Sequence, residues 1–401
     1  MKPRPVRPQR GRAAGWILLL LLGLASGLSS GCAHAPAPPR SASARLEPSG
    51  DCHRTASERF VLYSDPWVNL HHFLYQWARN VPPRKPGDPE ALEIPESQQI
   101  GELDERERAA WDRALLFYRE QLASRDLIHD SGLIALRNPL AAIACSGGTP
   151  DAIAAGLRAV LLDAMPVYRR HWWPGHLAQD QDWIERLLPA LKPNEAVLAG
   201  RLADAYGGRW SDERIRVDVA VYASWQGAYT TNDPNQITVA SDPRVWGVQG
   251  VDLVFHEVSH ASFFEQPLLG QLSAAFRAHG AHPPPGLAHA IQFVTASELV
   301  RRQLHGEDLR KFKPLAEMAG LFRNPQWARF KRVLEAHWVP FLAGKLGRAE
   351  ALDQVAADLT KPDKASETRH AYHLPAGNRV RALWIDPGDV DDRLSARLAR
   401  P

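Results

Sequence analysis

The sequence has no excess of charge of either sign. Its 48 lysines and arginines against 45 aspartates and glutamates give a formal net charge of +3. Five of the cations lie within the first twelve residues, and subtracting these five leaves −2 for the rest of the chain. Nucleic-acid-binding proteins usually concentrate positive charge on one face. The composition therefore argues against a nucleic-acid partner, and the chain also has no internal repeat.

The sequence also lacks an apolar run long enough to cross a membrane near its N-terminus. The run over residues 16–28 is shorter than the roughly 20 residues that a membrane-spanning helix needs. It follows a basic start and precedes the small residues Ser29, Ser30 and Gly31, which is the layout of a secretory signal. We therefore expect a removable leader over residues 1–31.

The end of this leader resembles the lipobox of bacterial lipoproteins, in which a cysteine becomes the lipid-modified first residue. The segment reads Leu28-Ser29-Ser30-Gly31-Cys32, and it departs from the usual lipobox at Ser29, where leucine is common. The resemblance implies a lipid anchor on Cys32, and Ala33 after it is typical of lipoproteins of the outer membrane, whether periplasmic or surface-exposed. An ordinary signal peptide with an incidental cysteine is the alternative.

Cysteine is scarce, with three residues in the whole chain. Besides Cys32 only Cys52 and Cys145 remain, and an oxidising compartment would allow them to form a disulfide. Two free thiols fit the sequence equally well, because the sequence gives no distance between them. Residues 32–56 are rich in Ala, Pro and Ser, which is typical of a flexible tether.

Hydrophobic periodicity predicts an α+β fold that is predominantly α-helical. Residues 57–210 are expected to form an N-terminal helical part, which begins with a short strand near 59–64 and a helix over 66–79. The clearest strand signals follow in residues 211–390, where segments from Arg214 and from Ile237 read as strands. The two parts are compatible with a single domain.

Immediately after these strands comes an HExxH motif. His256 and His260 share one face of a helix, so both can bind one metal ion, while Glu257 lies beside them and can accept a proton. The uncharged residues on either side of the motif are typical of a buried helix. The pattern predicts a metal site in which Glu257 is the catalytic residue.

A catalytic zinc site needs a third protein ligand and an open position for water. Glu298 and His289 both lie on a later predicted helix. Nine residues of α-helix turn through roughly 900°, which places these two side chains on opposite sides. The mostly apolar surroundings of Glu298 favour it as the third ligand, with His289 as the alternative.

The strands, the HExxH helix and the later glutamate together resemble the gluzincin branch of zinc metallopeptidases over residues 214–302. The resemblance implies a zincin-like catalytic part with a small antiparallel sheet beside the HExxH helix. It also implies one Zn²⁺ per chain, bound by His256, His260 and Glu298, and hydrolysis of a peptide or protein substrate with Glu257 as general base. The segment Trp225–Thr231 corresponds to the sheet edge that aligns an extended substrate in that family.

The sequence departs from the gluzincin pattern around the first histidine. Arg302 stands where related members have the aspartate that orients this histidine, so another carboxylate has to replace it, with Asp252 as the candidate. No motif identifies the residue that stabilises the oxyanion, and Tyr229, Tyr372 and His373 are all candidates.

Three functions remain open from the sequence. The first is a zinc metallopeptidase, a hydrolase anchored by lipid in the cell envelope. The second is a catalytically inactive zincin-like lipoprotein that acts as a binding or structural protein. The third is a metal-dependent hydrolase of a non-peptide substrate.

Overall fold

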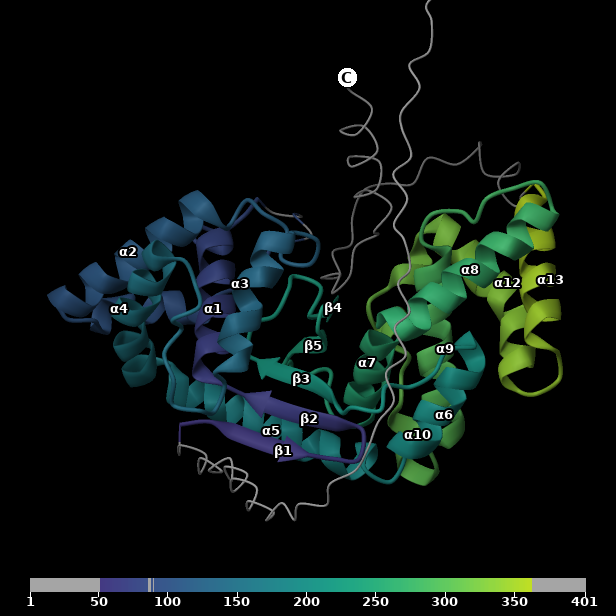
Figure 1. Ribbon diagram of the computed structural model, residues 1–401, viewed down its shortest axis with the longest axis horizontal. Coiled ribbons are helices and arrows are strands. Elements are labelled where there is room, and N and C mark those ends of the chain that lie inside the picture. Colours follow the sequence, from purple (N-terminus) through teal and green to yellow (C-terminus); the bar gives the residue numbers. More distant parts are fainter. Residues whose placement is uncertain (1–50, 86–87, 89, 363–401) are drawn as a thin grey trace, which may run out of the picture. The chain divides into compact units, whose positions relative to one another are not determined.

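The computed structural model describes residues 51–85, 88 and 90–362, apart from the side chain of Glu307. The predicted leader and Cys32 lie outside the described residues, and so do Tyr372 and His373. Within the described residues the chain forms helices around one sheet (Figure 1), which confirms the predicted α+β class and its helical character.

The sheet is mixed and has the strand order β1-β2-β3-β5-β4. Its strands are β1 (His53–Ala56), β2 (Phe60–Ser64), β3 (Ile215–Ala220), β4 (Ala228–Asn232) and β5 (Asn235–Ala240). The outer pairs β1–β2 and β4–β5 are antiparallel, but β3 is parallel to both β2 and β5. The expected antiparallel sheet is therefore wrong at its centre. Parallel neighbours need a long connection, and the chain between β2 and β3 supplies one.

The helices divide into a set before β3 and a set after β5. The first set is α1 (Pro66–Asn80), η1 (Pro95–Glu102), α2 (Glu105–Gln121), α3 (Ser131–Ala142), α4 (Ala155–His171), α5 (Trp173–Leu191) and α6 (Glu195–Tyr206). The second set is α7 (Val248–Ser259), α8 (Ser262–Ala278), α9 (Leu287–Gln303), α10 (Gly306–Lys311), α11 (Leu315–Met318), η2 (Leu321–Arg323), α12 (Pro325–Leu342) and α13 (Arg348–Thr360).

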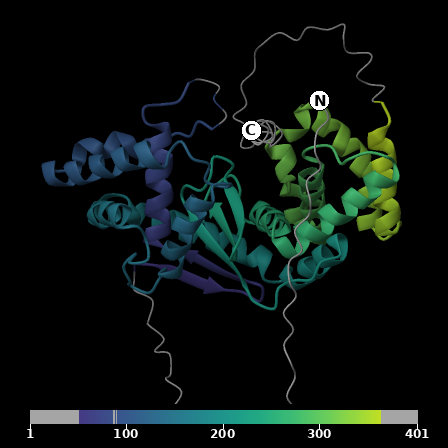
Figure 2. The ribbon, with the colours of Figure 1, turned by 45° about the horizontal axis from the view of Figure 1, so that its top comes forward.

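The two faces of the sheet belong to different hydrophobic cores. Val217, Val219 and Ile237 pack into a core with α5 to α9 and with α12 and α13. Tyr229 of β4 packs into a second core with α1 to α4. Figures 1 and 2 show the corresponding helices gathered on either side of the sheet. Because side chains alternate along a strand, β4 presents Tyr229 to the core around α1 to α4 and Thr230 to the side of α7.

The first helix, α1, illustrates how local sequence sets an element. Asp65 caps it by accepting hydrogen bonds from the backbone amides of Trp67 and Val68, and Pro66 takes the first helical position. The helix is buried all round, apart from Arg79 near its end. It therefore forms the centre of the second core instead of covering its surface.

The tether predicted over residues 32–56 is wrong at its C-terminal end, because residues 53–56 form β1. Side chains of β1 are alternately half-buried and exposed, without the apolar pattern that marks a strand in sequence. A disulfide between Cys52 and Cys145 joins the residue before β1 to the turn after α3, with a Cα–Cα distance of 5.4 Å. Of the two sequence alternatives for these cysteines, the structure has the disulfide.

The predicted parts 57–210 and 211–390 share one sheet, since β2 from the first pairs with β3 from the second. The described residues of both parts fall within one compact unit. The alternative of a single domain is therefore the one that the structure supports. Among the described residues, no helix combines the length and apolar character needed to span a membrane.

Candidate metal centre

The HExxH motif lies on α7, which is buried along almost its entire length. The helix starts after Gly247, whose φ of +56° is a left-handed conformation that favours glycine. It packs against α9, α5 and the strands β4 and β5. His256 is fully buried and Glu257 nearly so, while His260 is the cap residue that follows the last turn. The helical conformation is then interrupted at Ala261, whose backbone is extended, before α8 begins.

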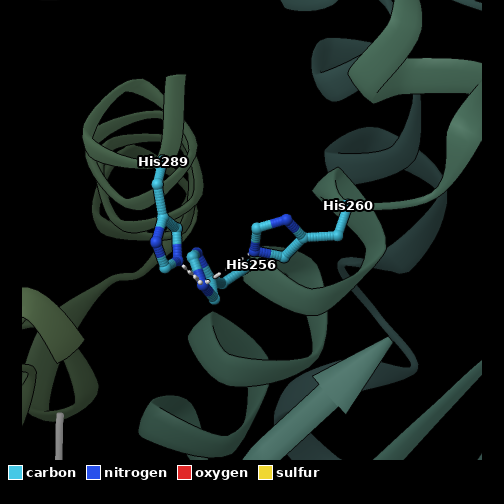
Figure 3. Close-up of side chains that lie close together, drawn as sticks. All are labelled: His256, His260 and His289. Carbon is cyan, nitrogen blue, oxygen red and sulfur yellow. Dashed lines mark hydrogen bonds between the residues drawn. The ribbon is translucent and has the colours of Figure 1, made fainter. Parts of the chain in front are cut away.

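Three histidines converge at the C-terminal end of α7 (Figure 3). The Nε2 atom of His256 lies 3.4 Å from Nε2 of His260 and 3.2 Å from Nε2 of His289. His289 comes from the first turn of α9, which packs directly on α7. The structure thus brings together His260 and His289, which lie 29 positions apart in the sequence.

The surroundings of His256 and His289 keep these two side chains in the form that binds metal. The ring of His256 stacks on Phe293 with centroids 3.7 Å apart, and His289 stacks on the same ring. Burial holds the pKa of His256 and of His289 well below the usual range, and the neighbouring histidines lower it further. Both side chains are therefore neutral near pH 7, and neutral imidazole is the ligand form.

The spacing of the nitrogens fits zinc. Zinc–nitrogen bonds of about 2.0–2.1 Å at tetrahedral angles separate two ligand nitrogens by about 3.3 Å. The two Nε2 separations of 3.2 and 3.4 Å bracket that value. Imidazole nitrogen is a preferred zinc donor, and three such ligands leave a fourth position for water.

Glu257 is held beside the histidines by the edge strand β4. The hydroxyl of Thr230 lies 2.8 Å from Oε2 of Glu257 and 2.7 Å from its backbone carbonyl oxygen. Burial raises the pKa of Glu257, although His260 and the Thr230 hydrogen bond oppose that change. A carboxylate with a raised pKa accepts a proton more readily than an exposed one. Thr230 was not singled out from the sequence, because no motif links it to Glu257.

Glu265 is a second residue that the sequence did not reveal. Its Oε1 atom lies 3.3 Å from Nδ1 of His260, and the amide of Gln292 approaches the same oxygen at 3.5 Å. Gln292 also donates a 2.9 Å hydrogen bond to the carbonyl of Ser259. These contacts join α8, the end of α7 and α9 around the cluster. Glu265 stands five residues after His260, outside the HExxH motif, so the motif does not identify it.

The prediction of Glu298 as the third ligand is wrong, and His289 takes that place in the cluster. Both oxygens of Glu298 accept hydrogen bonds from Arg301 at 2.8 Å, and Arg302 donates to Oε1 at 2.5 Å. Because α9 is continuous, the half-turn between the two residues turns Glu298 away when His289 faces α7. The apolar neighbours of Glu298 pack into the core without directing its carboxylate to the histidines.

The prediction that Asp252 orients His256 is also not met. Asp252 is fully buried and accepts hydrogen bonds from the Ser297 hydroxyl, at 2.8 and 3.0 Å, and from the backbone amide of Leu315. Burial raises its pKa to about 7. Asp252 therefore links α7 to α9 and α11, and it supports the packing that places His289.

Among the oxyanion candidates, Tyr229 points away from the histidines. Its hydroxyl hydrogen-bonds to Nε2 of His72 at 2.9 Å on the opposite face of β4 from Thr230. The alternation of strand side chains explains this, since neighbouring residues face opposite sides. The other two candidates, Tyr372 and His373, lie outside the described residues.

A second group of potential metal-binding atoms consists of Cys52, Asp65 and Cys145. The two sulfur atoms are joined in the disulfide, so they do not offer thiolates to a metal. Asp65 also has structural contacts, because it caps α1 and accepts a hydrogen bond from the amide of Cys145. Of the two groups among the described residues, the histidine cluster is therefore the candidate for binding a metal.

Comparisons of the chain with protein-family models, with curated proteins and with solved structures found no match.

Proposed function

We propose that this protein is a zinc-dependent hydrolase that cleaves peptide bonds. His256, His260 and His289 would hold the metal, and Glu257 is the general base. The observation that supports this best is the convergence of three Nε2 atoms at separations suited to zinc, with a buried carboxylate one residue away from a ligand.

When bound, zinc would supply a Lewis acid that polarises a carbonyl and lowers the pKa of its water toward 7. The chain supplies the proton transfer. Glu257 accepts the proton of the attacking water and then donates it to the leaving nitrogen, a role that its raised pKa favours. Thr230 fixes the carboxylate by its hydrogen bond to Oε2, so that the other oxygen remains for the proton.

The edge of the sheet supports a peptide as the substrate. The amide of Ala240 donates to the carbonyl of Gly227, directly opposite, at 2.7 Å. Antiparallel pairing alternates, so the backbone groups of Ala228 and Thr230 face the outer edge of β4. No described strand pairs with that edge. An extended peptide can add to such an edge by backbone hydrogen bonds, and Thr230 places it beside Glu257.

The ligand set differs from the one that the gluzincin resemblance implied, although the zincin-like reaction is the same. The third ligand is a histidine, and the glutamate that matched the family pattern is paired with arginines. Three neutral imidazoles leave the site with the full charge of the metal, whereas a glutamate would remove one unit of it. A more positive centre polarises a bound carbonyl more strongly.

Zinc analysis and one substitution test this proposal. The chain purified from residue 33 onward should contain about one zinc, and Glu257→Gln should keep that zinc while hydrolysis of a quenched peptide pool falls by about 10²–10⁴-fold. A zinc-free wild-type chain would refute the metal site. A zinc-bound chain that cleaves no peptide would instead favour the binding or structural role, and cleavage of esters alone would favour a non-peptide substrate.

The lipid anchor belongs to the same proposal. We infer that Cys32 is acylated and holds the enzyme at the outer membrane, on the strength of the segment Leu28–Cys32. Mass spectrometry of the detergent-extracted protein should show a diacylglycerol adduct on Cys32. Cys32→Ser should release the protein from the membrane fraction, and unchanged fractionation would contradict the anchor.

A further inference from the structure

We propose that Glu265 is a positioning residue of the metal centre, which holds the ring of His260 so that its Nε2 atom faces His256 and His289. The inference rests on the proposed function, because it assigns a role toward the same metal. Glu265 would take the role of the aspartate that orients the first histidine in gluzincins. It differs from that aspartate because it contacts the second histidine, His260, and comes from α8.

The hydrogen bond between the two side chains sets the tautomer of His260. Glu265 lies in the first turn of α8, and its Oε1 atom is 3.3 Å from Nδ1 of His260. A carboxylate oxygen accepts hydrogen bonds, so this contact favours the tautomer of His260 that has its hydrogen on Nδ1. Nε2 is then left with its lone pair, which is the atom that lies 3.4 Å from Nε2 of His256. Outer carboxylates of this kind orient metal-bound histidines in many proteins.

His260 needs such a partner more than the other two histidines do. It lies just beyond the last turn of α7, and 24% of its side chain is exposed. By contrast, His256 is inside the helix and stacks on Phe293. The side chain of Asn232 bonds to the carbonyl of His260 and to the amide of Ser262, which fixes the backbone at the helix break. Glu265 provides the corresponding restraint on the ring.

Glu265 also connects the two helices that carry the ligands. The amide of Gln292 lies 3.5 Å from Oε1 of Glu265 and donates to the carbonyl of Ser259. Gln292 is three residues after His289, so it lies on the same side of α9. A displacement of Glu265 would therefore disturb His260 directly and the position of His289 through Gln292.

The test measures binding of zinc alone to Glu265→Ala, Glu265→Gln and the wild type. Competition with a chromophoric chelator should show zinc affinity lowered by about 100-fold for Glu265→Ala and about 10-fold for Glu265→Gln, which keeps a neutral acceptor. The exposed Glu120→Gln is the matched control for loss of one negative charge and should bind zinc as the wild type does. Cobalt-loaded Glu265→Ala should show a changed visible absorption spectrum, because a misdirected His260 alters the coordination geometry.

Three results would overturn the proposal. Zinc affinity of Glu265→Ala equal to that of the wild type excludes a positioning role. A fall in affinity with an unchanged cobalt spectrum and a lower melting temperature of the metal-free variant shows a role in folding only. A wild-type chain that binds no zinc removes the metal centre itself and with it the proposed function.

Discussion

Two histidine clusters lie on opposite sides of β4: His71 and His72 of α1, whose ring centroids are 5.2 Å apart, and His256, His260 and His289 at the end of α7. They differ in the groups that their ring nitrogens contact. On the side of α1, Nδ1 of His72 bonds to the carbonyl of Val68 at 2.7 Å, and Nε2 bonds to the hydroxyl of Tyr229 at 2.9 Å. On the side of α7, Nε2 of His256 meets the Nε2 atoms of two other histidines. The first cluster uses ring nitrogens to join a helix to a strand, and the second gathers them at one point.

Burial and pKa do not distinguish these clusters. His72 and His256 are both fully buried. Burial lowers the pKa of His72 to about 4, and it holds the pKa of His256 well below the usual range. The distinguishing observation is geometric, because protein donors and acceptors satisfy a structural histidine, whereas metal ligands point their lone pairs toward a shared centre.

The largest expected effect concerns the choice between His289 and Glu298. His289→Ala should weaken zinc binding by more than the about 10–100-fold that follows loss of an outer partner, because it removes a ligand. Glu298→Gln should leave zinc binding unchanged. Equilibrium dialysis with metal analysis measures both variants. Loss of zinc from Glu298→Gln with retention in His289→Ala would reverse the assignment.

The next largest effect is expected for His72, in the cluster on the side of α1. His72→Leu should lower the free energy of unfolding by about 1–3 kcal/mol near pH 8, since it leaves the Tyr229 hydroxyl buried without its acceptor. Its zinc content should equal that of the wild type. Urea titration gives the stability, and the exposed His282→Leu serves as control. Loss of zinc from His72→Leu would mean that the two faces of β4 are not independent.

The same pair of proteins should respond differently to acid. Because the folded-state pKa of His72 is about 4, against 6.5 ordinarily, the unfolded chain takes up the proton first as the pH falls. The wild type therefore loses up to about 3 kcal/mol from this group between pH 6.5 and 4, a loss that His72→Leu avoids. The stability difference between the two should shrink over that range. A constant difference would show that His72 titrates normally.

The smallest expected effect comes from Thr230, which links β4 to Glu257 of α7. Thr230→Val should lower kcat/KM by about 10-fold, the scale of one hydrogen bond to a charged group, and leave zinc bound. Thr230→Ser keeps the hydroxyl and should retain most of the activity. Equal activity of the valine and wild-type proteins would show that Glu257 needs no support from the strand.

Local sequence patterns predicted much of the fold. The strand at Phe60–Ser64, the helix from Pro66 and the burial of the HExxH helix all follow from apolar spacing and punctuation. The parallel pairing of β3 could not be predicted, because its partner β2 lies about 150 residues earlier and no local signal specifies it. Strand β1 has no apolar alternation at all, and its pairing with β2 and the disulfide hold it in place.

The site was predictable as far as helix geometry reaches. The half-turn between His289 and Glu298 showed that only one of them can face α7. Which one does so depends on how α9 packs, and that is decided by contacts from distant residues such as Ser297 with Asp252 and Gln292 with Ser259. The residues that orient the site, Thr230 and Glu265, come from neighbouring elements and leave no mark on the motif.

The parallel pairing of β2 with β3 also determines when the sheet can fold during synthesis. A chain that ends before residue 215 can pair β1 with β2 but lacks β3, so it exposes the other edge of β2 without a partner. The full sheet can form only after β3, β4 and β5 have been synthesised, and the HExxH helix α7 follows directly after β5. Formation of this sheet and of the histidine cluster is therefore a late event in synthesis, and a fragment that stops at the middle of the sequence should aggregate instead of folding.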